Sequence, residues 1–97
     1  MYLHVSTKLK MGVPFGQFKA LVDKIKPTFE KHGWRLEKGL VSITGRVNSV
    51  VNIWHVPDAA ALQAGLFDPD LRRNIAEVHE IVEDEVVNLM MPYTPDK

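Results

Sequence analysis

Few side chains in this sequence have the chemistry to move protons, and His4 is the most favourable of them. It lies in YLHVSTKL (2–9), whose alternation of side-chain types predicts a β-strand. A histidine on the face of a sheet can act as a general acid or base near neutral pH, because its ordinary pKa is about 6.5. We therefore predict that His4 is catalytic; the alternative is a hydrogen-bonded histidine at a subunit interface.

A second set of candidates lies in VNIWHVPD (51–58), where an amide and an indole alternate with aliphatic residues. The period of two predicts that Val51 and Ile53 point into the core and that Asn52 and Trp54 share the opposite face with His4. An amide can hold a carbonyl or enolate oxygen, and an indole offers a flat wall to an aromatic ligand. The alternative is a packed indole beside an amide that pairs with a neighbouring backbone group.

The same alternation adds residues of the first and last predicted strands to this face, and Trp34 could frame the mouth of a cavity. The predicted substrate-binding residues are therefore Tyr2, Ser6, Trp34, Asn52, Trp54, Asn88 and Met90. The remaining histidines, His32, His55 and His79, are interpreted as structural.

No set of residues predicts a metal or cofactor site. The chain has no cysteine, and no two histidines have metal-ligand spacing on one element. Phosphate-loop and dinucleotide fingerprints are absent as well. The acidic residues Glu80, Glu83, Asp84 and Glu85 are interpreted as a solvated run. We expect neither a metal nor a cofactor.

Length and composition bound the class of protein. Ninety-seven residues predict one domain, residues 1–97, and 12 basic side chains balance 12 acidic ones. This balance leaves no electrostatic footprint for nucleic acid or an anionic membrane. The N-terminus has no signal-like apolar run, and no segment is long and apolar enough to span a membrane. We expect a cytoplasmic, soluble protein that binds neither nucleic acid nor membrane.

The elements that would position the candidates follow from hydrophobic periodicity. We predict strands at residues 2–9, 34–43, 49–56 and 85–91, and helical segments at residues 14–32, 59–66 and 69–82. Pro27 is expected to kink the first helix or to divide it from a final turn. The order β-α-β-β-α-β predicts an α+β, ferredoxin-like fold, with one antiparallel sheet and helices on one face.

Capping residues, a turn segment and a glycine within a strand support these boundaries. Gly33 is expected to cap the end of the first helix, and Asp58 and Asp68 the starts of the later ones. Residues 45–48 supply turn chemistry between the second and third strands, and Gly39 suggests a β-bulge.

Helices on one face leave the other face of the sheet uncovered. Aromatic, thioether and aliphatic side chains predicted there would form an apolar surface of the kind that marks an interaction site. A second copy of the sheet, related by a two-fold axis, would cover it, so we predict a homodimer. Two facing sheets would form a barrel-like enclosure that either keeps a cavity or packs dry.

At EKHGW (30–34) and TGRVNSVVNIWHVPD (44–58) the sequence resembles the NIPSNAP family of dimeric α+β barrel proteins. The family pattern is matched in spacing by Gly33, Gly45, Asn48, Val50, Val51, Asn52 and Trp54, and LMMPYTP (89–95) is similar to the family's ending. The family often has Arg-x-Tyr in its first strand, where this chain has Val5-Ser6-Thr7, so no role of those residues is carried over.

The resemblance implies a homodimeric barrel with a small-molecule cleft in each protomer. Related folds include cofactor-independent monooxygenases, cyclases, lactone isomerases and stress-responsive proteins. We predict a cofactor-independent enzyme of catabolic or secondary metabolism, of cyclase, isomerase or monooxygenase type. It would act on an aromatic or polyketide-like molecule in a cavity between sheet and helices of a homodimer. The alternatives are a non-catalytic binding or accessory protein and a structural dimer with a dry interface.

Overall fold

The computed structural model describes residues 1–45 and 48–94. Arg46 and Val47 of the predicted turn therefore lie outside the described residues, and so does Pro95, the last residue of the ending that resembles the family.

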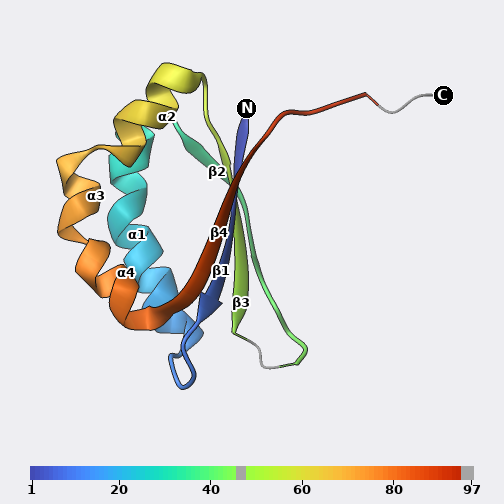
Figure 1. Cartoon of the computed structure of the whole chain (residues 1–97), viewed down its shortest axis with the longest axis vertical. Coiled ribbons are helices and arrows are strands. Elements are labelled where there is room, and N and C mark those ends of the chain that lie inside the picture. Colours follow the sequence, from blue (N-terminus) through green and yellow to red (C-terminus); the bar gives the residue numbers. More distant parts are fainter. Residues whose placement is uncertain (46–47, 95–97) are drawn as a thin grey trace.

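A four-stranded antiparallel sheet forms one layer of the molecule (Figure 1). β1 (Tyr2–Leu9) lies between β3 (Ser49–His55) and β4 (Val82–Met90), and β2 (Arg35–Val41) lies outside β3. The strand order β2-β3-β1-β4 is that of the ferredoxin-like fold, so the predicted fold class is confirmed. β4 begins before the predicted Glu85, because Val82 already pairs with Leu9 of β1.

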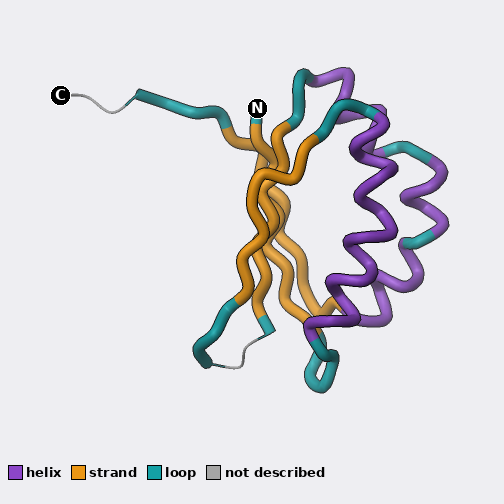
Figure 2. Tube along the Cα trace, turned by 180° about the vertical axis from the view of Figure 1, so that it is seen from behind, coloured by secondary structure: helices purple, strands orange, loops and turns teal. Residues whose placement is uncertain are grey.

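The helices form the second layer and lie on one face of the sheet (Figure 2). α1 (Phe15–Lys31) runs along the sheet, and α2 (Ala59–Leu66), α3 (Pro69–Arg73) and α4 (Ile75–Ile81) follow one another beside it. Among the described residues, none of these helices has the length and apolar character that crossing a membrane requires.

The predicted helix starts are confirmed, and one predicted helix is interrupted. The side chain of Asp58 accepts a hydrogen bond from the backbone N–H of Ala61, and Asp68 accepts one from Asp70. The helix predicted for residues 69–82 is divided at Asn74, whose side-chain amide donates to the Asp70 carbonyl at 3.0 Å. A local bond of this kind competes with continued helical pairing.

Of the two effects predicted for Pro27, a kink or a division of the helix, the division does not occur, because α1 continues through this residue. Proline removes one backbone donor from a helix. Thr28 and Phe29, which follow it, are both buried, and we attribute the continuation of the helix to the packing of this last turn. Gly33 then follows the helix with φ of +85°, which agrees with its predicted capping role.

The core lies between the sheet and the helices, in two clusters of buried side chains. One is aromatic and contains Leu3, Phe29, Trp34, Trp54 and Val56. The other is mainly aliphatic and contains Leu9, Phe18, Leu21, Val50 and Ile81. The candidate site lies between these two clusters and is lined by residues of both.

The pairing of β1 with β3 shows that the predicted facing of β3 is wrong. Trp54 is opposite Leu3 and Asn52 is opposite Val5, and residues directly opposite each other share a face of the sheet. Leu3 packs in the aromatic cluster under the helices, so Asn52 and Trp54 also face the helices. Both sets of alternating residues in this strand contain aliphatic side chains, so either set could face the helices. We attribute the observed facing of β3 to the larger apolar area that the Trp54 indole buries.

The uncovered side of the sheet is called here the open face. It carries the alternate residues of each strand, those that point away from the helices. Tyr2, His4 and Ser6 of β1 are opposite Met90, Asn88 and Val86 of β4. On the β3 side, the same three residues are opposite His55, Ile53 and Val51. Tyr2, His4, Ser6, Asn88 and Met90 thus share the open face, as predicted.

Candidate functional site

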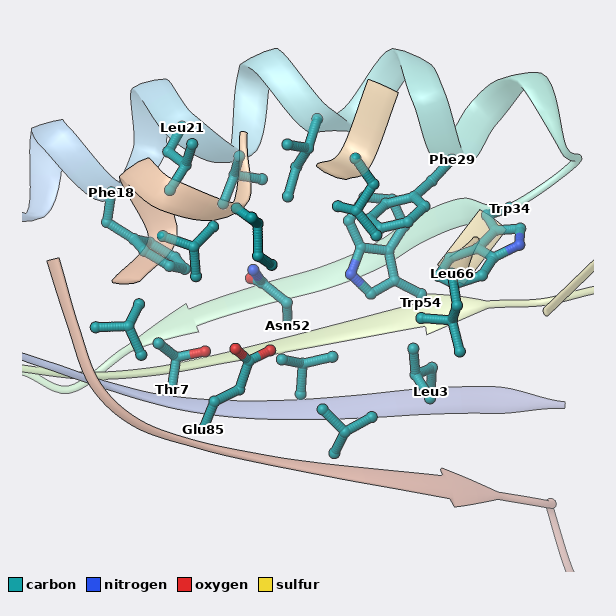
Figure 3. Close-up of a pocket in the computed structure, with 18 residues that line it drawn as sticks. Leu3, Thr7, Phe18, Leu21, Phe29, Trp34, Asn52, Trp54, Leu66 and Glu85 are labelled. Carbon is teal, nitrogen blue, oxygen red and sulfur yellow. The ribbon is translucent and has the colours of Figure 1, made fainter. Parts of the chain in front are cut away.

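A pocket of about 250 Å3 lies between the sheet and the helix layer. Eighteen residues line it (Figure 3), from β1, β3, β4, the helices and Trp34 just before β2, and nearly all are apolar. The polar side chains among them are Thr7, Asn52 and Glu85, apart from the ring nitrogens of two tryptophans. A largely apolar pocket with a few convergent polar groups is typical of a small-molecule site.

Three aromatic rings form one wall of the pocket. Phe29 and Trp34 stack with centroids 4.3 Å apart, and Trp54 meets both rings edge-on, at 5.1 and 6.1 Å. The indole Nε1 of Trp34 donates to the Ala61 carbonyl at 2.8 Å, which holds this ring against α2. Gly65 of α2 permits this approach, because a Cβ there would lie 2.6 Å from the Trp34 ring.

The three polar side chains come from three neighbouring strands. Thr7 of β1 is directly opposite Glu85 of β4, and Asn52 of β3 is opposite Val5, two residues before Thr7 on the same face. Thr7 and Asn52 are buried, and Figure 3 shows both side chains projecting into the pocket with the Glu85 carboxylate between the strands and the helices. The sheet therefore gathers a hydroxyl, an amide and a carboxyl in an apolar setting.

Burial raises the pKa of the Glu85 carboxyl above its ordinary value, and the charge of His79 partly opposes this shift. The residue is nevertheless exposed on one side, because β4 is an edge strand. A carboxyl with a raised pKa is a stronger base when ionised, which suits proton transfer. Glu85 is exposed, which agrees with its interpretation as part of a solvated run, but it also lines the pocket, which that interpretation did not include. The alternation of the strand could have revealed this position, because Glu85 is two residues from Val87 and shares its face of the sheet.

The structure brings some predicted site residues together and separates the rest. Trp34, Asn52 and Trp54 all line the pocket. The others, Tyr2, His4, Ser6, Asn88 and Met90, lie on the open face, so His4 is not brought together with Asn52 and Trp54. Their role in binding stays a prediction that requires a second layer over that face.

A separate polar cluster joins α1 to α3 and has a structural character. His32 Nε2 lies 2.7 Å from Asp68 Oδ2, and Lys31 Nζ lies 2.9 Å from the same oxygen. The pKa of Asp68 is lowered well below its ordinary range by its hydrogen bonds with His32, with the Asp70 backbone N–H and with Lys31. Within residues 1–45 and 48–94, no group of three or more His, Asp or Glu side chains is placed to hold a metal ion.

No family model matches this sequence, and no curated protein matches it. Among solved structures, the chain is similar to protein Atu4242 of Agrobacterium tumefaciens, a NIPSNAP family protein with unknown function. The TM-score is 0.77 at 20% identity, over 96% of this chain and 94% of that chain. It is also similar to a NIPSNAP domain protein of Burkholderia xenovorans, with a TM-score of 0.73 at 20% identity over 99% and 100% of the two chains.

The chain is similar as well to SnoaB, a cofactor-independent oxygenase from Streptomyces nogalater, with a TM-score of 0.73 at 13% identity over 98% of both chains. Identities this low show a common fold and not a common activity. The resemblance predicted from the sequence is thus confirmed for the fold. The chain has the fold of NIPSNAP family proteins, which is also the fold of a cofactor-independent oxygenase.

Proposed function

We propose that this chain is a cofactor-independent enzyme that transfers protons on a small aromatic or polyketide-like molecule in the pocket between sheet and helices. The observation that carries this proposal is the Glu85 carboxyl, with its raised pKa, in an otherwise apolar pocket beside Thr7 and Asn52. Acid–base and hydrogen-bonding groups that meet in a largely apolar pocket are typical of proton-transfer sites.

In this proposal Glu85 is the general base. Its carboxylate removes a proton from the carbon next to a ketone, and the electron pair of the broken C–H bond moves onto the ketone oxygen. The Asn52 amide donates a hydrogen bond to the resulting enolate oxygen, which an apolar surrounding strengthens. Glu85 then returns the proton to another carbon, which isomerises the ligand, or to the oxygen formed when the enolate carbon attacks a second carbonyl, which closes a ring.

The aromatic wall supports the choice of ligand. Phe29, Trp34 and Trp54 present flat apolar surfaces, and ring–ring contacts contribute about 0.5–1.5 kcal/mol beyond the burial of area. The ring of Trp34 is held by its hydrogen bond to the Ala61 carbonyl, so this wall is preorganised.

Exchange of carbon-bound hydrogen tests the proposal. The probe is 2-tetralone, a fused-ring ketone, in D2O, with deuterium uptake followed by NMR. The wild-type chain is expected to accelerate uptake, and Glu85→Gln to lower the rate by about 10²–10⁴-fold, the usual contribution of a general base. Glu83→Gln is the matched control, since Glu83 lies on the same strand and does not line the pocket.

Two results would count against the proposal in different ways. If 2-tetralone binds but the chain does not accelerate its exchange, the alternative of a non-catalytic binding protein is favoured. If 2-tetralone causes no change in tryptophan fluorescence or in the heat of mixing, neither role of this pocket stands.

The proposal includes a homodimer that covers the open face. Val86 and Met90 on this face are 49% and 46% exposed, and no helix of the described chain lies over them. Exposed apolar side chains on one face of a sheet favour association of like surfaces through a two-fold axis. Light scattering after size-exclusion chromatography would test this, and a monomer mass at micromolar concentration would contradict it.

The predicted role of His4 depends on this second sheet. His4 is central on the open face, between Ile53 and Asn88, and its buried Nδ1 atom has no hydrogen-bond partner among the described residues. In a dimer it would lie at the interface, where a partner group can pair with that nitrogen.

A further inference from the structure

A second cavity, of about 210 Å3, lies on the other side of the sheet–helix space, between α1 and β2. Its walls include Phe15 of α1 and Leu36 and Val41 of β2, so it is mainly apolar. At its rim Lys19 and Asp23 pair with each other at 3.5 Å. This cavity opens beside β2, whereas the first pocket opens beside β4 at the opposite edge of the sheet.

The two cavities meet across three side chains. Phe18 and Val22 of α1 and Asn52 of β3 line both of them. Asn52 is the polar member of this shared wall, and its amide is the group that a ligand reaching from one cavity to the other would pass.

An irregularity in β2 makes room for the Asn52 side chain. The pairing of β2 with β3 shifts between Leu36 and Lys38, with the result that Gly39 is opposite Asn52. Without this shift, Lys38 would occupy that place. A Cβ at Gly39 would lie 3.2 Å from Asn52 Oδ1, so any larger residue would press on the amide.

Asn52 is a largely buried residue whose side chain lines both cavities. The residue is 8% exposed, and its side chain takes part in no hydrogen bond with the residues that the structure describes. The amides of Asn48 and Asn74, in contrast, donate to the backbone carbonyls of Leu9 and Asp70. An amide that lines two cavities and makes no hydrogen bond with the described residues is suited to pair with a ligand.

The volumes also favour one combined site. Each cavity, at about 250 and 210 Å3, is smaller than the roughly 300 Å3 at which ligand pockets for drug-sized molecules begin. Joined across the Asn52 side chain, they fall within that range.

We propose that the two cavities are one elongated site, divided at its middle by Asn52, for a ligand with a carbonyl oxygen between two apolar ring systems. One ring system occupies the pocket of Trp54 and the other occupies the cavity beside Val41, while the Asn52 amide donates to the oxygen between them. This inference rests on the proposed function, because it assigns the shape and polarity of the ligand of the same site.

Binding of three probes separates this inference from the proposed function. Acetophenone has one ring and a ketone, benzophenone has a ketone between two rings, and diphenylmethane has the two rings without the oxygen. Calorimetry and tryptophan fluorescence report their dissociation constants, since both tryptophans of the chain line the first pocket. The wild-type chain is expected to bind benzophenone about fivefold more tightly than diphenylmethane, the value of one hydrogen bond.

Substitutions in the second cavity test the shape of the site. Val41→Trp fills that cavity from its partly exposed rim and is expected to weaken benzophenone at least about tenfold while leaving acetophenone unchanged. Gly39→Ala crowds the Asn52 amide and is expected to act in the same direction more weakly. Ile43→Trp is the matched control, since Ile43 is exposed and lines neither cavity.

Asn52→Ala tests the polar contact and keeps the test valid if one β2 variant fails to fold. It is expected to abolish the preference for benzophenone over diphenylmethane. The inference is overturned if wild-type chain binds acetophenone but not benzophenone, or if Val41→Trp weakens both ketones equally; the proposed function survives either result. If no probe binds the wild-type chain, the inference and the proposed function both fail.

Discussion

The two faces of the sheet are built from the same strands, yet they use their polar residues differently. The face toward the helices carries Thr7, Asn52 and Glu85 around a largely apolar pocket. The open face carries His4, Ser6 and Asn88 among side chains such as Val86 and Met90 that remain about half exposed. The first face can hold a ligand within one chain, whereas the second can enclose something only when another molecule covers it. Position under the helices, more than residue type, separates the candidate site from the candidate interface.

Replacing each of the two candidate bases in turn is expected to give the largest difference in exchange rate between the two faces. In the 2-tetralone assay, Glu85→Gln is expected to lower the rate by about 10²–10⁴-fold, and His4→Ala to leave it within a few-fold, because His4 lies on the far side of the sheet. The reverse result would move the chemistry to the open face and restore the role predicted for His4.

Truncation of one aromatic residue on each face should give the next largest contrast. Trp54→Ala is expected to lower the free energy of unfolding by about 3–5 kcal/mol, because the indole is 3% exposed and contacts Phe29 and Trp34. Tyr2→Ala, on the open face, should cost clearly less. Urea denaturation at concentrations below those of dimer formation measures both. Equal losses would mean that the open face is already packed within one chain.

A charge on the open face should break the dimer and spare the fold. Val86→Lys is expected to weaken association by about 3 kcal/mol or more, since it would place an unpaired charge in the interface. Analytical ultracentrifugation would show a shift toward the monomer, with an unchanged circular dichroism spectrum. Ile43→Lys, outside the open face, is the control. If both variants sediment like the wild-type chain, the interface lies elsewhere.

The smallest expected effect is a difference in the pH dependence of stability. The contribution of Glu85 in the pocket and that of Asp68 in the α1–α3 cluster should change with pH in opposite directions. Burial raises the pKa of Glu85 in the folded chain, so its contribution to stability is present below its ordinary value of 4.5 and is lost as pH rises through the raised pKa. The pKa of Asp68 is lowered, so its contribution is present above its ordinary value of 3.8 and is lost as pH falls toward the lowered pKa.

Thermal melting between pH 2 and 8 measures both effects. Glu85→Gln is expected to flatten the loss of stability above pH 4.5, and Asp68→Asn the loss below pH 3.8. A Glu85→Gln curve parallel to that of the wild-type chain would show that the carboxyl is fully solvated and poorly placed to act as a base.

Local signals predicted the elements well and their facing less well. The boundaries of β1 and α2 are those predicted, because alternation and the Asp58 cap are local properties of the chain. The facing of β3 was wrong because Val51 and Ile53 on one parity compete with Val50, Trp54 and Val56 on the other. Either choice buries aliphatic side chains, and the structure takes the second, in which the large Trp54 indole packs with Leu3 of β1 and Phe29 of α1.

The candidate site was predicted in part. Asn52, Trp54 and Trp34 were identified as pocket residues and do line a pocket, although on the face under the helices. Glu85 was overlooked because three other acidic residues precede it within the same short segment. Its neighbour Thr7 becomes relevant only through the pairing of β1 with β4, which joins residues far apart in the chain.

The amino-acid sequence by itself determined the order of strands and helices and therefore the fold, because periodicity, caps and turns act over a few neighbouring residues. Only the tertiary structure decided which side of β3 is buried, which carboxyl enters the pocket and that Gly39 is opposite Asn52. These features depend on strand register and on a one-residue shift in β2. Register is set by the packing of the whole sheet against its helices, which no local pattern contains.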